Sequence, residues 1–396
     1  MSTVILGTRG TSRHQFAGSM WVRLQYMLGL LKLGIDAYWV DRLRTVNAED
    51  PYHSLDYRMW RFGRAMEDFG LADRYCVIVE GGKQYFGMSE AKLRDVVDRA
   101  DLLLNISGFL PPNCPLVGVR RRAFIDVDPG FTQIWARQMD IGIDRHHAFF
   151  TVGQNVGGPG FTIPTDGVNW VPIVPPVHLE EWPDRTDPRR VRFSTVADWR
   201  AAQDAMYDDE YYGGKRKEFV RFLRLPRDSG QRIELALCIS MEDCEDIELL
   251  VGNEWKLVSP AEVAGDPRSY REFVQFSRAE FSVAKGGYVK SRSGWISDRT
   301  ACYLASGKPA LVQSTGFEPH IPTGQGLLTF RSMDEAMEGI RQINAHYLDH
   351  CRAARRLAEE HFDSEIVLRQ ILRHAGVMFE EHRNPSLAST SAGGQT

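Results

Sequence analysis

The segment from residue 291 to residue 299 carries the groups best suited to bind a phosphate. It is rich in serine and glycine, and it leads into a helix predicted from residue 298 to residue 306. The first N–H groups of a helix have no partner within it, and the helix dipole is positive at that end, which suits a diphosphate. Ser293, Ser297 and Arg299 would add hydroxyl and guanidinium donors.

The same helix start also has a purely structural interpretation. Ser297 or Asp298 could cap the helix, because serine and aspartate side chains accept hydrogen bonds from its first free N–H groups. The spacing of the residues leaves capping and phosphate binding both open.

Polar residues that follow predicted strands in the N-terminal part could take part in proton transfer or metal binding. His14 lies in the glycine-bearing loop 7–14 and titrates in the range that a general base needs, although a loop histidine is often only solvated. Asp126 and Asp128 flank a single residue at the end of another predicted strand. Two carboxylates so placed can bind a hard cation, and Asp128 is also a candidate base.

Several common kinds of enzyme are disfavoured because their motifs do not occur in the sequence. There is no GxSxG, HExxH or GxxxxGK[ST] pattern, and the first loop reads Gly7-x-x-Gly10 rather than GxGxxG. The six cysteines form no CxxC pair, so neither a zinc site nor a disulfide scaffold is predicted. Free cysteines favour a reduced, cytoplasmic setting.

The composition is that of a globular protein, for which neither nucleic acid as a partner nor an integral membrane segment is expected. The 396 residues suggest two or three domains, and 43% are hydrophobic while 25% are charged. The formal net charge is -4, whereas proteins that bind nucleic acid usually carry a basic surplus. The most hydrophobic long stretch, residues 21–40, contains Arg23, Lys32 and Asp36, and the N-terminus lacks the pattern of a signal peptide. A soluble protein is therefore expected.

The elements that must position these residues alternate between strand and helix. An apolar run at residues 4–6 is followed by the polar loop, a helix over residues 18–34 and a strand at 35–41, which together form a βαβ unit of a parallel sheet. Further strands are predicted at residues 75–79, 102–106, 123–127, 149–153, 191–196, 233–239, 255–258, 279–283 and 310–312. Further helices are predicted at residues 89–99, 270–277, 298–306, 334–348 and 350–361.

A proline-rich stretch over residues 172–188 divides these elements into two α/β halves and is interpreted as a linker. Residues 385–396 are small and polar, and they are expected to form a flexible tail. Because ligands of parallel α/β sheets bind beyond the carboxyl ends of the strands, the loops there are the expected place of a site.

The segment from residue 281 to residue 330 resembles the donor-binding part of GT-B glycosyltransferases. The stretch 305–309 (Ala-Ser-Gly-Lys-Pro) leads into a predicted strand as in those enzymes, and the stretch 294–297 is similar to their phosphate loop. The stretches 314–317 and 324–328 look like the paired glycine loops that follow. The resemblance implies an α/β fold of two Rossmann-like domains that face each other across a cleft.

The resemblance also implies that the two halves of the chain bind different substrates. Residues 1–175 would bind the acceptor, a small molecule or a glycan, and residues 190–384 would bind a nucleoside diphosphate sugar as donor. Neither a metal nor a further cofactor would be needed. His14 and Asp128 are the candidate catalytic residues, as bases of an inverting transfer. The donor-binding residues implied are Gly10, Arg200, Lys215, Ser293, Gly294, Trp295, Ser297, Asp298, Arg299, Thr315 and Gly316.

The basic residues in this set have a simpler alternative. Arg200 and Lys215 are similar to the donor-binding arginine and lysine of the family in placement, not in strict motif. They could instead be the solvated basic start of a helix, since surface charges usually contribute little. Lys285, which follows another predicted strand, is a lesser candidate for the same role.

The sequence departs from the family pattern at two positions. Many members of the group that it most resembles carry two glutamates eight positions apart, one of which usually holds the donor ribose. Gly294 and Cys302 stand at those places, and neither can accept a hydrogen bond as a carboxylate does. A nucleotide-sugar epimerase of the same fold and a non-catalytic sugar- or nucleotide-binding protein therefore stay open as alternatives.

Overall fold

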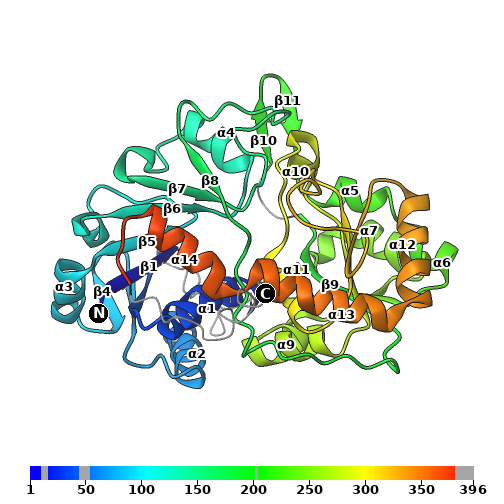
Figure 1. Ribbon diagram of the computed structural model, residues 1–396, viewed down its shortest axis with the longest axis horizontal. Helices are drawn as coiled ribbons and strands as arrows, with labels where there is room; N and C mark the ends of the chain where they lie inside the picture. Colours follow the sequence, from blue (N-terminus) through cyan, green and yellow to red (C-terminus); the bar gives the residue numbers. More distant parts are fainter. Residues whose placement is uncertain (10–16, 44–53, 201–203, 380–396) are drawn as a thin grey trace, which may run out of the picture.

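The computed structural model describes residues 1–9, 17–43, 54–200 and 204–379. Within these residues the chain forms two units, each built on a parallel sheet, which lie side by side in Figure 1. The predicted residues Gly10 and His14 and the predicted tail lie outside the described residues. Among the helices of the described part, none is both long and apolar enough to cross a membrane.

The first unit contains a sheet with the strand order β4-β3-β2-β1-β5-β6-β7-β8, in which only the pairing of β3 with β4 is antiparallel. The order reverses between β1 and β5, as in a doubly wound sheet. The strands are β1 (Thr3–Arg9), β2 (Asp36–Leu43), β3 (Tyr75–Val79), β4 (Gln84–Gly87), β5 (Leu102–Ile106), β6 (Arg122–Asp126), β7 (Ala148–Thr151) and β8 (Trp170–Pro172). The helices are α1 (Ala17–Lys32), α2 (Leu55–Asp68), α3 (Glu90–Arg99), η2 (Pro115–Gly118), α4 (Phe131–Gln138) and η3 (Ile143–Arg145).

The second unit contains a fully parallel sheet with the order β13-β12-β9-β14-β15-β16, which is the strand order of a Rossmann fold. Its strands are β9 (Phe193–Asp198), β12 (Ile233–Cys238), β13 (Lys256–Val258), β14 (Ala279–Ser282), β15 (Ala310–Gln313) and β16 (Leu327–Phe330), and a separate hairpin is formed by β10 (Ala205–Tyr207) and β11 (Glu210–Tyr212). The helices are α5 (Arg216–Val220), α6 (Leu225–Ser229), η4 (Met241–Asp243), α7 (Cys244–Gly252), α8 (Pro260–Val263), α9 (Pro267–Gln275), α10 (Gly286–Ser291), α11 (Asp298–Ala305), α12 (Met333–Ala345), α13 (Tyr347–Leu357), η5 (Ala358–Phe362) and α14 (Ser364–His374).

One hydrophobic core continues from the first unit into the second. It contains Trp21 of α1 together with Trp182, Tyr270 and Cys302, all of which are buried. The Trp21 indole N–H also donates to the Pro267 carbonyl at 2.8 Å. The two units are therefore packed against each other and not merely linked.

The last helix returns to the first unit. α14 lies beside α1 in Figure 1, and the approach is close because a Cβ at Gly29 would stand 2.5 Å from the Leu368 side chain. Lys32 at the end of α1 pairs with Glu365 at 2.8 Å. The predicted division into residues 1–175 and 190–384 stays a prediction, and α14, which it assigns to the second half, packs on the first.

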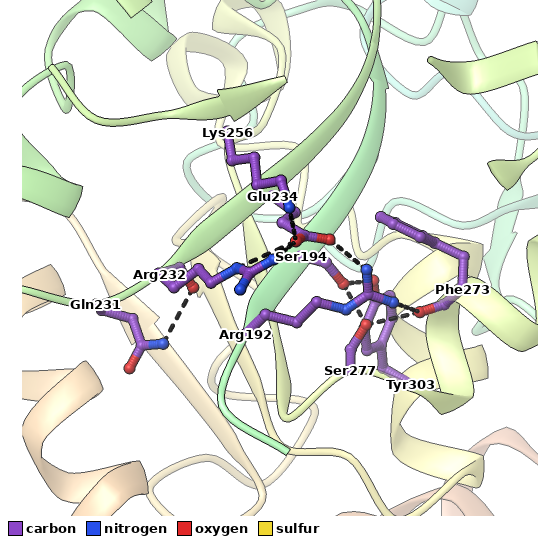
Figure 2. A network of polar contacts seen from close by, with 9 residues as sticks. All are labelled: Arg192, Ser194, Gln231, Arg232, Glu234, Lys256, Phe273, Ser277 and Tyr303. Atoms are coloured by element: carbon purple, nitrogen blue, oxygen red, sulfur yellow. Dashed lines mark hydrogen bonds and ion pairs between the residues drawn. The ribbon is translucent and has the colours of Figure 1, made fainter. Parts of the chain in front are cut away.

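The amino ends of β9 and β12 hold a dense network of polar contacts, which Figure 2 shows. Glu234 of β12 accepts from Arg232 at 2.6 Å and pairs with Lys256 at 3.1 Å and with Arg192. Burial opposes the ionisation of Glu234, but hydrogen bonds from these arginines outweigh it and lower the pKa to about 2. The network fastens neighbouring strands at the edge opposite the expected site.

The predicted α/β class with two Rossmann-like units is confirmed. The strands predicted at residues 75–79 and 102–106 are β3 and β5, and the predicted linker region contains no helix or strand from residue 173 to residue 192. The loop predicted over residues 7–14 starts later, because Gly7 and Thr8 pair in register with Val40 and Asp41 and belong to β1. The sequence did not indicate β16 or the β10–β11 hairpin, since strands this short show little periodicity.

Candidate functional site

The carboxyl edges of the two sheets face each other, and one ion pair joins them. Asp128 follows β6 of the first sheet, and Lys285 follows β14 of the second. The Lys285 amino group donates to Oδ1 of Asp128 at 2.6 Å, and the Tyr288 hydroxyl donates to the same oxygen. Since ligands of doubly wound sheets bind beyond the carboxyl ends of the strands, this contact marks the candidate site.

Lys215 lies at the same edge, on a loop that is hydrogen-bonded to the residues after Lys285. The backbone N–H groups of residues 286 and 287 donate to the carbonyls of residues 214 and 213 at 3.1 and 2.9 Å. All four of these residues are glycines, which allows the two backbones to approach closely. Two lysines that are 70 residues apart in the sequence are thereby brought to one place.

The Lys215 side chain is buried without a bonded anion. It is only 8% exposed, and its amino group makes no hydrogen bond or ion pair with any residue of the described chain. Burial, followed by the positive charges of Arg299 and Lys285, lowers the pKa of Lys215 to about 7. A buried cation in this position is unfavourable by itself, and a bound anion would remove the penalty.

The predicted phosphate loop is in contact with backbone from the first unit. The N–H groups of residues 154 and 155 donate to the carbonyls of Gly294 and Ser293 at 3.2 and 3.1 Å, and Gly153 forms an antiparallel bridge with Trp295. Gly294 has a φ of 71°, and a Cβ there would lie 2.9 Å from the Asn155 nitrogen, so a glycine is required. The loop therefore joins the two units, and its contact with a diphosphate stays a prediction.

Thr315 and Gly316 hold the same loop in place. The Thr315 carbonyl accepts from the Gly294 N–H at 2.9 Å, and the Thr315 hydroxyl donates to the Trp295 carbonyl at 2.6 Å. The side-chain amide of Asn155 donates to the Gly316 carbonyl at 2.9 Å. Asn155, which sequence reasoning missed, thus fastens the first unit to the predicted donor loop.

The start of α11 shows the structural role that the sequence left open. The Ser297 hydroxyl accepts from the Arg299 N–H at 3.2 Å and caps the helix. Burial raises the pKa of the Asp298 carboxyl. Asp298 lines a cavity of about 20 Å³ together with Tyr26 and Trp295, which is room for a water molecule and not for a diphosphate.

The Arg299 guanidinium is engaged inside the second unit. Its Nε donates to Glu280 at 2.7 Å, and its other two nitrogens donate to the Val196 carbonyl at 2.7 Å and to the Ser282 hydroxyl at 2.6 Å. The Arg299 and Glu280 side chains are 8% and 0% exposed. This geometry favours a role in fixing α11 on the sheet over the predicted phosphate contact.

Arg200 belongs to a separate cluster of ion pairs. Its Nε donates to Asp243 at 2.6 Å, and its side chain is 65% exposed. The neighbouring Arg216 pairs with Asp246 at 2.6 Å. Within the described chain, the structure brings Lys215 to Lys285 but gives Arg200 no contact with either.

Asp126 and Asp128 do not point to a common centre. Asp126 accepts hydrogen bonds from the hydroxyls of Thr132 and Thr151 at 2.6 and 2.7 Å. Burial raises the pKa of Asp126 to about 6 in spite of these bonds. Asp126 accepts hydrogen bonds from residues of the segment that follows β6, whereas Asp128 bonds to Lys285. The two carboxylates are therefore not arranged as ligands of one cation. No trio of His, Cys, Asp or Glu side chains suited to a metal ion is found among the described residues.

Arg23 of α1 is a second residue that the motifs did not indicate. It is 9% exposed, it donates to Ser19 of its own helix, and its Nε makes no hydrogen bond with a residue that the structure describes. Burial lowers the pKa of Arg23, while the charges of Asp41, Asp298 and Asp128 oppose this shift. The arginine therefore lies near carboxylates of both units. The signal that could have found it is its position inside the most hydrophobic stretch of the chain.

Comparison with known proteins identifies the fold only. No family model matches the chain, and no curated protein matches its sequence. An alpha-glucosyltransferase in complex with UDP and a 13-mer DNA matches with a TM-score of 0.60 at 11% identity, over 95% of this chain and 100% of that chain. AviGT4, a glycosyltransferase involved in Avilamycin A biosynthesis, matches with 0.54 at 14% identity, over 95% and 97%. HepE of Anabaena in complex with UDP matches with 0.52 at 10% identity, over 95% and 100%.

These likenesses extend over both units and agree with the strand orders given above. This chain contains two Rossmann-like units packed through a common core, and its fold matches that of these glycosyltransferases over 95% of its length. The chain therefore has the GT-B fold of glycosyltransferases.

Proposed function

We propose that the chain is a glycosyltransferase, which moves a sugar from a nucleoside diphosphate sugar to a hydroxyl or amine of an acceptor. The observation that carries this proposal is the buried amino group of Lys215, which lies near Lys285 and is not bonded to an anion of the described chain. A diphosphate would supply the missing negative charge. Proteins of the same fold that hold UDP support this class of ligand.

The chemistry of such a transfer explains why two lysines are needed. The bond between the sugar C1 and a diphosphate oxygen breaks, the acceptor atom bonds to C1, and the acceptor proton passes to a base. Negative charge builds up on the leaving diphosphate, so fixed cations stabilise the transition state. Lys215 and Lys285 supply these cations in the proposal, and no metal ion takes part.

Asp128 is the proposed base among the described residues. Its carboxylate accepts hydrogen bonds from Lys285 and Tyr288, so it is held at the boundary between the two units. A diphosphate that attracts Lys285 would free Asp128 to accept the acceptor proton. His14, in the segment after β1, is the alternative base.

Calorimetry with UDP tests the donor site on the whole chain. We expect Lys215→Ala to weaken binding by roughly 1.5–3 kcal/mol, or about 10- to 150-fold, which is the scale of a hydrogen bond to a charged group. Lys217→Ala is the matched control, because Lys217 is exposed and lies 4.2 Å from the centre of the Tyr211 ring. If folded Lys215→Ala binds UDP as tightly as the wild type, the proposed donor site is wrong.

Turnover of nucleotide sugars separates transfer from its alternatives. A transferase consumes the donor only when an acceptor is present, an epimerase converts the donor without one, and a non-catalytic protein does neither. Asp128→Asn is expected to lower turnover about 10²–10⁴-fold while UDP affinity stays within about twofold, because the loss concerns proton transfer. Unchanged turnover in Asp128→Asn would assign the base to His14 or to the leaving diphosphate.

A further inference from the structure

A glutamine at the carboxyl end of β15 contacts both of the segments that carry the proposed donor-binding lysines. Gln313 is the last residue of β15 and is only 3% exposed. Its Oε1 atom accepts from the backbone N–H of Ala284 at 3.0 Å, and its Nε2 atom donates to Glu218 at 2.6 Å. Ala284 directly precedes Lys285, and Glu218 follows Lys215 by three residues. One buried amide therefore connects the two lysine-bearing segments.

The contact with Ala284 supplies a hydrogen bond that the sheet does not provide. The parallel ladder between β14 and β15 ends at Ser282 and Val312. Ala284 lies two residues beyond this end and is buried. A buried N–H needs an acceptor, because water cannot provide one there. The Gln313 oxygen is this acceptor, so the course of the chain from β14 to Lys285 depends on the glutamine side chain.

The contact with Glu218 fixes the short helix that begins after Lys215. Lys215 is the N-cap residue of α5, and its carbonyl accepts from the Phe219 N–H at 2.9 Å. Residues three positions apart lie on the same side of a helix, so Glu218 is on the side of α5 that Lys215 occupies. The Glu218 carboxylate also accepts from Arg221 at 2.6 Å. Because hydrogen bonds to a charged acceptor are stronger than those between neutral groups, Gln313 is a strong anchor for α5.

These contacts add to the bonds between glycine backbones described above. The bonds between residues 213–214 and residues 286–287 join the two segments to each other, whereas Gln313 joins both segments to the sheet. The segments are also in van der Waals contact, since a Cβ at Gly286 would lie 3.7 Å from the Glu218 side chain. The position of both segments on the sheet thus depends on one side chain.

The chemistry of β15 makes this glutamine conspicuous. The other residues of the strand, at positions 310–312, are apolar, as is typical of a buried parallel strand. A buried amide in such a strand is unfavourable unless its oxygen and nitrogen are hydrogen-bonded. Gln313 meets this condition through the two lysine-bearing segments, so its polar side chain serves the candidate site.

We propose that Gln313 is a positioning residue that sets the spacing of Lys215 and Lys285, and that this spacing makes the site specific for a diphosphate over a monophosphate. A diphosphate has two phosphoryl groups and can contact both amino groups at once. A monophosphate gains less from the second lysine. The inference rests on the proposed function, in which the two lysines bind the diphosphate of the donor. Gln313 itself does not contact the ligand in this proposal.

Gln231 provides a matched control at the opposite edge of the same sheet. It is also a buried glutamine, and its side chain donates to the carbonyls of Val191 and Arg232 at 2.6 and 3.0 Å (Figure 2). Alanine in place of Gln231 or of Gln313 removes buried hydrogen bonds, so urea denaturation should show a similar loss of stability in the two variants. Only Gln313→Ala should alter the lysines.

Calorimetry with UDP and UMP on the full chain tests the spacing. We expect the wild type to bind UDP about tenfold more tightly than UMP, since UDP can contact both lysines. Gln313→Ala is expected to weaken UDP binding about tenfold and to leave UMP binding within about twofold, whereas Gln231→Ala keeps both affinities. An unchanged ratio of UDP to UMP affinity in folded Gln313→Ala, or an equal change in Gln231→Ala, contradicts the proposal.

An exchange of the two side chains separates positioning from a general loss of packing. Gln313→Glu keeps an acceptor for the Ala284 N–H but places a second carboxylate against Glu218, so it should weaken UDP binding about tenfold or more. Adding Glu218→Gln restores the hydrogen bond with donor and acceptor reversed and should return UDP affinity to within about threefold of the wild type. Arg221→Ala controls for the lost ion pair of Glu218 and should leave UDP affinity unchanged. A double variant that binds UDP no better than Gln313→Glu overturns the role of Gln313.

Pyrophosphate and phosphate, followed by phosphorus NMR, separate this inference from the proposed function. We expect the wild type to prefer pyrophosphate and Gln313→Ala to lose this preference. If this result is obtained with a chain that binds no UDP, the spacing of the lysines is supported and the proposed function is wrong. If Lys215→Ala weakens UDP binding but Gln313→Ala does not, the proposed function stands and the inference is wrong. A chain that binds neither UDP nor pyrophosphate overturns both.

Discussion

At the amino end of the second sheet the carboxylate of Glu234 is bonded to three cations, whereas at the carboxyl end of the same sheet the amino group of Lys215 has no bonded partner in the described chain. Both side chains are largely buried. Figure 2 shows the first of these regions, in which Arg192 just before β9, Arg232 just before β12 and Lys256 on β13 surround one glutamate.

This difference in charge pairing indicates a different role for each edge of the sheet. Where buried charges are fully paired, as around Glu234, the pairs serve the stability of the fold. Where a buried charge is left unpaired, the fold loses stability, and a ligand of opposite charge can recover it. Natural proteins break the rules of stability mainly at functional sites, so the contrast supports the carboxyl edge as the site.

The largest expected effect concerns a paired charge that lies close to Lys215. Arg299→Met leaves the buried Glu280 carboxylate without its cation, and breaking a buried pair in this way costs about 3–5 kcal/mol. Urea denaturation measures the loss. If the free energy of unfolding falls by less than about 1 kcal/mol and UDP affinity is lost, Arg299 binds the donor as the sequence predicted.

Lys215→Met, unlike Arg299→Met, is expected to stabilise the chain. The folded pKa of about 7 lies below the ordinary value of 10.5, so the unfolded chain binds more protons between these values and stability rises with pH across them. The variant removes the penalty, which is largest below pH 7, and should gain about 2–4 kcal/mol at pH 6 and less at pH 9. Denaturation of both proteins at the two pH values gives the comparison. A variant that is less stable than the wild type at pH 6 would show that Lys215 is already compensated.

Glu234→Gln tests the paired side of the contrast. The substitution keeps the shape but loses the charge that three cations share, and we expect it to cost about 1.5–3 kcal/mol while UDP affinity stays unchanged. Because the folded pKa of about 2 lies below the ordinary 4.5, the wild-type advantage is complete above pH 4.5 and is lost as the pH falls toward 2. Acid titration of the two proteins by circular dichroism follows this loss. If Glu234→Gln changes UDP affinity, the assignment of ligand binding to the carboxyl edge alone is wrong.

Removal of divalent metal is expected to have the smallest effect. If Lys215 and Lys285 neutralise the diphosphate, EDTA should change neither UDP affinity nor turnover, since cationic side chains take the place of a metal. Calorimetry and a turnover assay with and without EDTA decide this. Loss of turnover in EDTA with recovery in manganese would require a metal site that the proposal does not contain.

Much of the fold could be predicted from the sequence because its elements are local. Buried parallel strands are continuous apolar runs, and helices show apolar residues at a spacing of three to four, so β3, β5, α3 and α11 were expected close to where they lie. The short β16 and the hairpin were not expected, because a strand of three or four residues is too brief for its pattern to stand out.

The candidate site could be predicted only in part. Lys285 and Asp128 were predicted from their positions after strands, and Lys215 was predicted from the family resemblance. Arg200 and Arg299 received equal or greater weight, since an arginine that a carboxylate neutralises looks the same in sequence as one that no carboxylate neutralises. Arg23 and Asn155 belong to no motif.

The sequence by itself determined the alternation of strands and helices, the two-part organisation and the loops at which a site could lie. These follow from hydrophobic period and from glycine and proline, which act over a few residues. Only the tertiary structure decided which charges are neutralised by the protein and which are left for a ligand. That outcome depends on contacts between distant residues, such as the glycine backbones that bring Lys215 to Lys285, and on burial, which makes an unpaired charge matter.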